Sequence, residues 1–265
     1  MNSKSPVLRF KQSRIRALFR MGGVCLLLLS GVIIGMISWV FPNTQGVFFL
    51  KKLLYRGIRR CAGINKVIIQ GVSCTQEILA VSNHLSYLDI MLLGEQVPYV
   101  FVAKKEVKAW PLIGWIARQL GTIFIQRTLR GIREGQKNIR QSIQENKPVL
   151  VFAEGTTGNG ILTELFYQAF FELSAHINIQ PISICYVEIN GFPALSWVRR
   201  HLSWIGDAAL FPHLFQNLGW RSLTVAITFH SPFAAGSCRK RSAARAAYTV
   251  RCGISKSLKI EDNYA

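Results

Sequence analysis

The sequence predicts an α/β domain with a largely parallel sheet flanked by helices, preceded by an N-terminal membrane-inserted helical segment. From about Cys61 onward, short β-rich runs alternate with segments that have helical length and periodicity. Some of these runs, such as residues 149–152, are apolar on both faces, which is typical of central strands covered on both sides. Before Cys61, residues 22–41 contain no charged side chain.

Residues 22–41 have the length of a membrane helix, because about 20 residues rise about 30 Å, the thickness of the hydrocarbon core. A cleaved signal peptide is the competing interpretation. It is disfavoured because its apolar region is typically about 7–15 residues long. In addition, no small-x-small cleavage site precedes the aromatic residues Trp39 and Phe41.

Both flanks of this apolar run are basic and lack acids. The bases are Lys4, Arg9, Lys11, Arg14, Arg16 and Arg20 before it, and Lys51, Lys52, Arg56, Arg59 and Arg60 after it. A helix that dips into one leaflet and returns, bent near Gly31, Gly35 or Pro42, satisfies the positive-inside rule on both flanks. A single-pass anchor followed by a basic amphipathic helix over residues 47–58 is the alternative, and the sequence leaves both open.

After the membrane segment, the elements follow in order. Strands are expected at 67–69, 78–81, 99–103, 122–126, 149–152, 179–187 and 223–229. Helices are expected at 85–93, 110–120, 130–145 and 164–176, with a basic surface helix over 239–259. We therefore divide the chain into a membrane-associated part, residues 1–61, and an α/β domain, residues 62–265.

The charge balance predicts an anionic partner. Lys and Arg number 32 against 13 Asp and Glu, a formal net charge of +19, in a chain of 265 residues that is 50% hydrophobic. Anionic membrane lipids or an acidic carrier protein fit this combination. A nucleic-acid partner is not expected, because the apolar run and the lack of a recognition element do not fit one. With no Cys-x-x-Cys or His-Glu-x-x-His spacing, no metal site is expected, and the six cysteines are interpreted as reduced thiols of a cytosol-facing protein.

His84 and Asp89 form the first candidate site. His84 follows a predicted strand, and Asp89 comes five residues later, about one turn into the next helix. A carboxylate at this spacing can accept a hydrogen bond from the imidazole, fix its tautomer and stabilise the imidazolium that forms on proton abstraction. The pair is a candidate general base. A capping aspartate beside an incidental histidine is the alternative from these residues alone.

Two further blocks end predicted strands. Arg127 closes residues 121–127 at the carboxyl end of a strand, where α/β sheets bind ligands, and a guanidinium suits phosphate or carboxylate. Glu154 and Gly155 close residues 152–157 in the same way, so that the carboxylate can orient an acceptor or its cationic group. Residues 180–184 form a proline-containing strand that is uninformative alone.

In this order and spacing, the four blocks resemble the glycerolipid acyltransferase family, which includes bacterial 1-acylglycerol-3-phosphate acyltransferases. The family pattern is His-x4-Asp, Gly-x-x-Phe-Ile-x-Arg, Phe-Pro-Glu-Gly-Thr-Arg and a late proline-containing strand. The resemblance covers roughly residues 66–232, and residues 204–207 and 212–214 look like a subgroup that includes lyso-ornithine lipid acyltransferases. It implies a glycerol-3-phosphate-acyltransferase-like fold.

The resemblance also implies roles for individual residues. His84 matches the general base and Asp89 its orienting acid, while Arg127 matches the arginine that binds glycerophosphate. The acceptor-binding turn is matched by Glu154, Gly155 and Thr156.

Two residues depart from the family pattern. Ala153 replaces a proline, and Thr157 replaces an arginine that often helps to hold phosphate. Lys104 is a nearby base that can substitute for the missing arginine in substrate binding.

We therefore expect an O-acyltransferase that moves a fatty acyl group from acyl carrier protein or coenzyme A to the hydroxyl of a lysolipid. The resemblance implies no bound cofactor, because the acyl thioester is a co-substrate. It also implies no acyl-enzyme, and the chain lacks a Gly-x-Ser-x-Gly elbow that could form one. The resemblance favours 1-acylglycerol-3-phosphate as acceptor, giving phosphatidic acid, with lyso-ornithine lipid as the alternative. A non-catalytic lysolipid-binding membrane protein is the rival of another class. The expected location is the bacterial inner membrane, with the catalytic domain in the cytosol.

Overall fold

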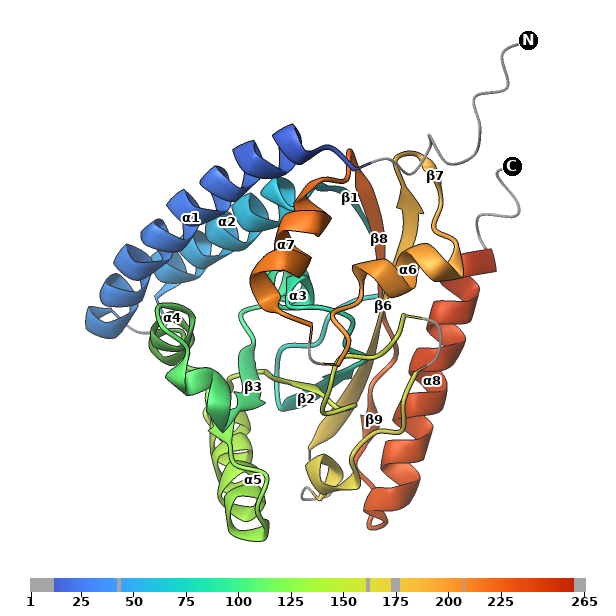
Figure 1. Ribbon diagram of the computed structural model, residues 1–265. Coiled ribbons are helices and arrows are strands. Elements are labelled where there is room, and N and C mark those ends of the chain that lie inside the picture. Colours follow the sequence, from blue (N-terminus) through green and yellow to red (C-terminus); the bar gives the residue numbers. More distant parts are fainter. Residues whose placement is uncertain (1–11, 42–43, 161–162, 173–176, 207, 260–265) are drawn as a thin grey trace.

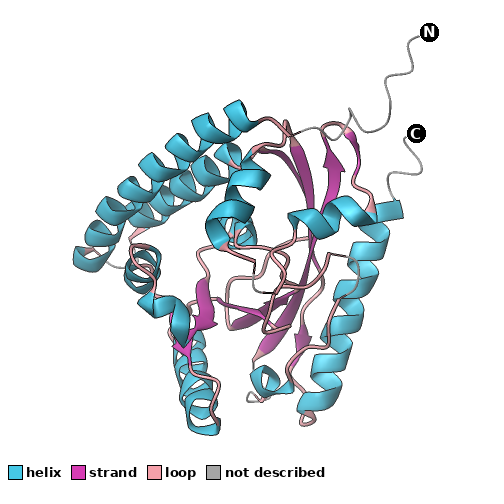
Figure 2. Cartoon of the chain, viewed as in Figure 1, coloured by secondary structure: helices cyan, strands magenta, loops and turns pink. Residues whose placement is uncertain are grey.

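The computed structural model describes residues 12–41, 44–160, 163–172, 177–206 and 208–259. Within this part of the chain, a mixed sheet with the strand order β1-β8-β6-β2-β5-β3-β4 is flanked by helices, and β7 and β9 pair with β6 (Figure 1). The predicted α/β fold is confirmed. Figure 2 shows the strands gathered in the centre of the molecule and the helices outside them.

The seven predicted strands are present, together with two short strands that the sequence did not suggest. The strands are β1 (Ile64–Gln70), β2 (Ile78–Ser82), β3 (Val100–Lys104), β4 (Ile123–Ile125), β5 (Val149–Phe152), β6 (Asn178–Ile189), β7 (Phe192–Pro193), β8 (Leu223–Phe229) and β9 (Phe233–Ala234). The helices are α1 (Arg14–Val40), α2 (Gln45–Cys61), α3 (Leu88–Gln96), α4 (Ile113–Gln119), α5 (Leu129–Gln144), α6 (Ser196–Leu202), α7 (Leu210–Leu218) and α8 (Arg239–Lys259), with 3₁₀ turns η2 (Lys105–Ala109) and η3 (Gln168–Phe171).

The strands from β6 to β4 run parallel to one another. On the other side of β6, β8 is antiparallel to it and β1 is parallel to β8, so the sheet is parallel for most of its width and mixed at one end. Because β2, β5, β3 and β4 are neighbours with the same direction, their carboxyl ends meet at one edge of the sheet. Ligands of α/β sheets bind at such an edge.

Successive strand residues point to opposite faces of the sheet, and each face has its own core. Ala80 of β2 lies in a core shared with α1, α3, α6 and α7, while its neighbours Leu79 and Val81 lie in a core shared with α5 and α8. All three side chains are at most 1% exposed. The central strands are thus covered on both faces, which explains their uninterrupted apolar sequences.

Helices α1 and α2 form a hairpin that lies against the α/β domain (Figure 1). The two helices approach closely at glycines: a Cβ on Gly57 would lie 2.9 Å from the Leu27 side chain. At the beginning of α1, the Ser13 backbone N–H and the Arg16 guanidinium both donate to the Gly219 carbonyl after α7, each at 2.9 Å. The start of α1 is therefore tied to the α/β domain.

The end of the hairpin is tied to the same domain by a buried ion pair. Arg59 of α2 donates through Nε to Glu95 Oε2 of α3 at 2.5 Å and through Nη1 to the Ile64 carbonyl at 2.6 Å. Arg56 adds a bond from Nε to the other Glu95 oxygen at 2.8 Å. Burial disfavours ionisation of Glu95, but the hydrogen bonds and charges of Arg59 and Arg56 outweigh it and lower the pKa of its carboxyl.

Helix α1 presents an apolar face away from the protein. With 27 residues it is long and apolar enough to cross a membrane. It begins eight residues before the charge-free run, because Ser13 caps it and accepts from the Arg16 N–H at 3.3 Å. Its large exposed apolar side chains are Ile15, Leu18, Phe19, Leu26, Leu29, Ile33, Met36, Trp39 and Val40.

Three expectations about helices need correction. Helix α3 begins at Leu88, three residues later than expected, because residues 83–87 form a turn around Asp89. The amphipathic helix expected over residues 47–58 is present as α2, but much of its apolar face packs on α1 and α3, and Phe49 and Leu53 remain exposed. The predicted helix over 164–176 is wrong for the described residues up to 172, because residues 164–167 have no regular secondary structure and only the 3₁₀ turn η3 follows them.

Candidate active site

Four of the predicted site residues follow four neighbouring parallel strands. His84 comes two residues after β2, Glu154 two residues after β5, and Arg127 two residues after β4, while Lys104 is the last residue of β3. The fold therefore brings residues that are up to 70 positions apart to the same edge of the sheet.

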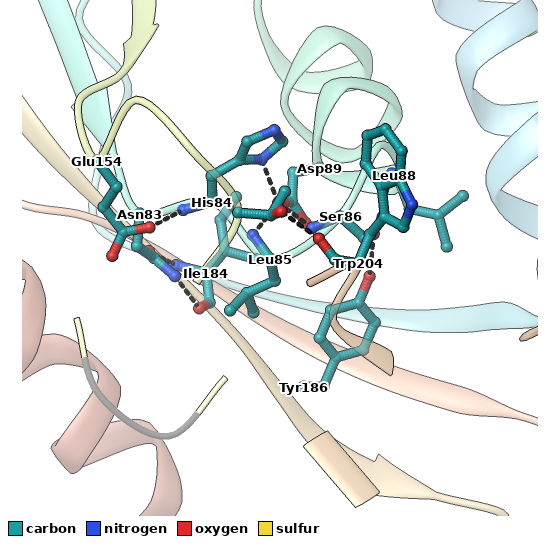
Figure 3. A network of polar contacts seen from close by, with 11 residues as sticks. Asn83, His84, Leu85, Ser86, Leu88, Asp89, Glu154, Ile184, Tyr186 and Trp204 are labelled. Atoms are coloured by element: carbon teal, nitrogen blue, oxygen red, sulfur yellow. Dashed lines mark hydrogen bonds and ion pairs between the residues drawn. The ribbon is translucent and has the colours of Figure 1, made fainter. Parts of the chain in front are cut away.

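The His84 imidazole is oriented by Asp89 in the first turn of α3 (Figure 3). Nδ1 of His84 and Oδ2 of Asp89 are 2.9 Å apart. A carboxylate accepts only, so Nδ1 carries the proton and Nε2 keeps its lone pair. The Asp89 side chain is fully buried and that of His84 is 17% exposed, so the imidazole is the part of the pair that a substrate can reach.

Backbone groups and an aromatic ring hold this pair in place. Asp89 Oδ2 also accepts from the backbone N–H groups of Leu85, at 2.6 Å, and Ser86, at 2.9 Å. The Phe152 ring at the end of β5 stacks on the imidazole, with centroids 3.9 Å apart and planes 13° apart. Both the plane and the tautomer of His84 are thus fixed before a substrate binds, which favours proton transfer.

Asn83 fastens the same turn to β6, a role that the sequence analysis missed. Its Nδ2 donates to the Ile184 carbonyl and its Oδ1 accepts from the Ile184 N–H, both at 2.9 Å. The side chain thereby continues the β2–β6 ladder past Ser82. Only its position beside His84 could have drawn attention to it.

The Glu154 carboxylate binds backbone N–H groups, whereas an acceptor or its cationic group was expected as its partner. Its side chain is buried, and its two oxygens accept from the backbone N–H groups of His84 at 2.7 Å and Glu164 at 2.9 Å. Burial raises the pKa of its carboxyl to about 7; the charges of Asp89 and Glu164 act in the same direction, and the two hydrogen bonds oppose them.

Gly155 is required by the conformation of the turn. Its φ is +66°, and a Cβ would lie 2.7 Å from the Tyr167 ring. The Gly155 carbonyl accepts a hydrogen bond from the Arg127 guanidinium. The residue therefore joins the turn after β5 to the arginine after β4.

Arg127 and Lys104 make the edge of the sheet basic. Both residues are exposed. Partial burial and the nearby Arg127 guanidinium lower the pKa of the Lys104 ammonium, an effect that Glu106 partly offsets. Two cations that destabilise each other in this way are stabilised by an anion bound between them.

A segment after α6 covers the turn that carries His84. The Trp204 N–H donates to the Leu85 carbonyl at 2.8 Å, and the Trp204 carbonyl accepts from the Thr157 hydroxyl. The indole contacts the rings of Tyr87 and Trp110 edge-on, with centroids 5.9 and 6.1 Å apart. The Thr157 hydroxyl is thus occupied within the protein, whereas Thr156 is exposed.

Comparisons with known proteins bear on this geometry. The acyltransferase family profile matches residues 63–185, which include the His84, Arg127 and Glu154 blocks. A lyso-ornithine lipid O-acyltransferase from Pseudomonas aeruginosa is 32% identical over 253 residues, which are 91% of this chain and 95% of the relative. The chain belongs to the acyltransferase family. It is an enzyme of that family.

Other members of the acyltransferase family are similar over shorter or more divergent stretches. A 1-acyl-sn-glycerol-3-phosphate acyltransferase from Neisseria gonorrhoeae is 27% identical over 57% of this chain and 58% of its own. The crystal structure of the 1-acyl-sn-glycerophosphate acyltransferase from Thermotoga maritima matches with a TM-score of 0.68 at 18% identity, over 91% of this chain and 94% of the other. That likeness shows the same fold in both proteins.

Proposed function

We propose that the protein transfers a fatty acyl group from a thioester to the free hydroxyl of a lysolipid, with His84 as the general base. The observation that carries this proposal is the bond between His84 Nδ1 and the fully buried Asp89 carboxylate, 2.9 Å long, which leaves Nε2 free to accept a proton. A mere capping aspartate would not require a histidine whose ring is also stacked on Phe152.

The reaction balances without a cofactor. Nε2 of His84 takes the acceptor's hydroxyl proton as the oxygen attacks the thioester carbonyl, and Asp89 stabilises the imidazolium. The tetrahedral intermediate expels the thiolate, which takes the proton back from Nε2. The products are an ester and a free thiol, and the histidine returns to its starting state.

We assign lyso-ornithine lipid as the first candidate acceptor. Relatives with that activity from Pseudomonas aeruginosa and Rhizobium meliloti are 32% and 34% identical to this chain. The headgroup has one carboxylate, which matches a single guanidinium such as Arg127. Thr157 supplies no second cation, and its hydroxyl is bonded to Trp204.

Lysophosphatidate is the second candidate. The basic pair of Arg127 and Lys104 supports it, because a phosphate monoester carries more negative charge than a carboxylate. The relative from Neisseria gonorrhoeae is named for that acceptor.

Paired kinetics on the two acceptors separate these candidates. We expect wild-type protein to have the higher kcat/KM with lyso-ornithine lipid, and Thr157→Arg to shift the ratio toward lysophosphatidate by about 10–100-fold, the effect of one charge-assisted hydrogen bond. Thr157→Val, which also loses the bond to Trp204, is the control for that loss. Exclusive use of lysophosphatidate by wild type would reverse the order of the candidates.

For the donor, we propose an acyl thioester of acyl carrier protein or coenzyme A. Both are anionic, and the carboxyl edge of the sheet continues into the exposed bases Lys105 and Lys108 of η2 and Arg130 of α5. The same positive charge favours a membrane that contains anionic lipids.

We propose that the α1–α2 hairpin inserts its exposed apolar face into the bacterial inner membrane from the cytosolic side. Arg16 at the start of α1 and Arg59 near the end of α2 both bind groups of the α/β domain, which supports one side for both ends. A single-pass anchor would break the first contact, since Arg16 would lie across the membrane from Gly219.

Cysteine labelling tests this topology. In a protein in which Cys25 is serine, Arg14→Cys and the native exposed Cys238 are expected to react with a membrane-impermeant maleimide only after the cells are permeabilised. Labelling of residue 14 in intact cells, with Cys238 still protected, would establish the single-pass alternative.

A further inference from the structure

One loop holds both backbone polar groups of the catalytic histidine. The His84 N–H donates to Glu154 Oε2 at 2.7 Å, and the His84 carbonyl accepts from the Gly158 N–H at 2.7 Å. One position earlier, the Ala153 N–H donates to the Ser82 carbonyl at 3.1 Å. The end of β2 and the turn after it are therefore joined to the segment after β5 by three hydrogen bonds, and one of these bonds is made by a side chain, that of Glu154.

That side chain is not available to a substrate in this arrangement. Glu154 is 3% exposed, and its second oxygen is occupied by the Glu164 N–H. Gly158 closes over the carboxylate, since a Cβ there would lie 3.4 Å from Oε2. In Figure 3 the Glu154 carboxylate lies against the backbone of His84, on the side opposite to Asp89.

Burying an ionised carboxylate at this position costs free energy. Among the described residues, no lysine or arginine forms an ion pair with it, and burial together with the charges of Asp89 and Glu164 opposes its ionisation. A neutral amide would avoid that penalty. An amide, however, offers one acceptor oxygen, whereas the carboxylate offers two to the converging N–H groups of His84 and Glu164.

We propose that Glu154 is a positioning residue: its carboxylate fixes the backbone of His84, and through it the direction of Nε2, and it does not bind the acceptor. This inference rests on the proposed role of His84 as the base. Its consequence is that Glu154 governs turnover, whereas acceptor binding is left to Arg127, an exposed residue of the neighbouring turn after β4. Displacing a catalytic group by about 1 Å costs on the order of 100-fold in rate.

The test is the separation of kcat from KM in Glu154→Gln. We expect kcat to fall by about 10–100-fold while the KM for the acceptor stays within about twofold, because the amide retains the side chain's size and loses one acceptor oxygen. Glu154→Asp keeps the charge but cannot reach both N–H groups, so it should show the same pattern to a smaller degree. Arg127→Lys is the matched comparison and should mainly raise the KM.

Each outcome decides the matter. A raised KM with unchanged kcat in Glu154→Gln would overturn the inference and return the residue to acceptor binding, and so would unchanged kinetics. If Glu154→Gln does not fold, the same criteria apply to Glu154→Asp. Assays of His84→Ala distinguish failure of this inference from failure of the proposed function. Normal activity of His84→Ala would refute the proposed function itself. An inactive His84→Ala together with a Glu154→Gln variant that changes only the KM would refute this inference alone.

Discussion

Replacing His84 by alanine is expected to lower kcat by about 10²–10⁴-fold, the usual contribution of a general base. The loss follows from removing Nε2, the atom that takes the acceptor proton in the proposed mechanism. Folding should persist, because the backbone N–H and carbonyl of residue 84, bonded to Glu154 and Gly158, remain in the variant. Steady-state acyl transfer by purified protein in detergent, with circular dichroism and melting as the check on folding, measures both effects.

Asp89→Asn provides the companion variant. It keeps the size of the side chain, but one of its two polar atoms is now an amide NH₂ group, which donates instead of accepting. Where that group faces His84 Nδ1, it favours the tautomer with the proton on Nε2; where it faces the Leu85 and Ser86 N–H groups, those bonds are lost. A large loss of kcat is expected here too. Near-normal turnover by purified His84→Ala would refute general-base catalysis at this residue.

Arg59→Met is expected to destabilise the protein by about 3–5 kcal/mol, because it leaves Glu95 buried with a partner lost. The two side chains are 8% and 5% exposed, so water cannot replace the guanidinium. For a chain of this size the melting temperature should fall by about 10 °C. The ion pair lowers the pKa of Glu95. Its contribution to the free energy of unfolding is therefore present at neutral pH and is lost as the pH falls below the ordinary glutamate range.

Arg56→Met is the matched control, because it removes the other bond to Glu95. Its side chain is 40% exposed, and exposed pairs contribute about 0–1 kcal/mol. Equal melting temperatures for Arg59→Met and wild type would mean that the pair does not fasten the hairpin to the α/β domain.

The strands and the location of the site could be predicted because local sequence determines them. Buried parallel strands require runs apolar on both faces, and such runs are visible in residues 149–152. The spacing of His84 and Asp89 predicted their contact, which the structure shows at 2.9 Å. The carboxyl-edge positions of Arg127 and Glu154 followed from strand direction alone.

The orientation of Glu154 and the conformation of residues 164–172 could not be predicted, because both depend on tertiary contacts. A carboxylate at the end of a strand has the same local sequence whether it faces a ligand or the backbone of another turn. Residues 164–172 have helical periodicity, yet residues 164–167 form no regular secondary structure and only the 3₁₀ turn η3 follows them. In this segment the Tyr167 N–H donates to the Ala153 carbonyl at 2.8 Å, and the Glu164 N–H donates to the Glu154 carboxylate. These contacts with residues distant in the sequence outweigh the local preference for a helix.

The most direct test of the account is product analysis with the wild-type enzyme. Purified protein is incubated with an acyl thioester and either lyso-ornithine lipid or lysophosphatidate, and the masses of the lipids and of the intact protein are measured by mass spectrometry. General-base catalysis by His84 predicts a lipid heavier by one esterified acyl group and a protein whose mass never changes, because a base that activates the acceptor forms no bond to the acyl group. A protein that carries a covalent acyl group during turnover, or the absence of product from both lysolipids, would contradict it.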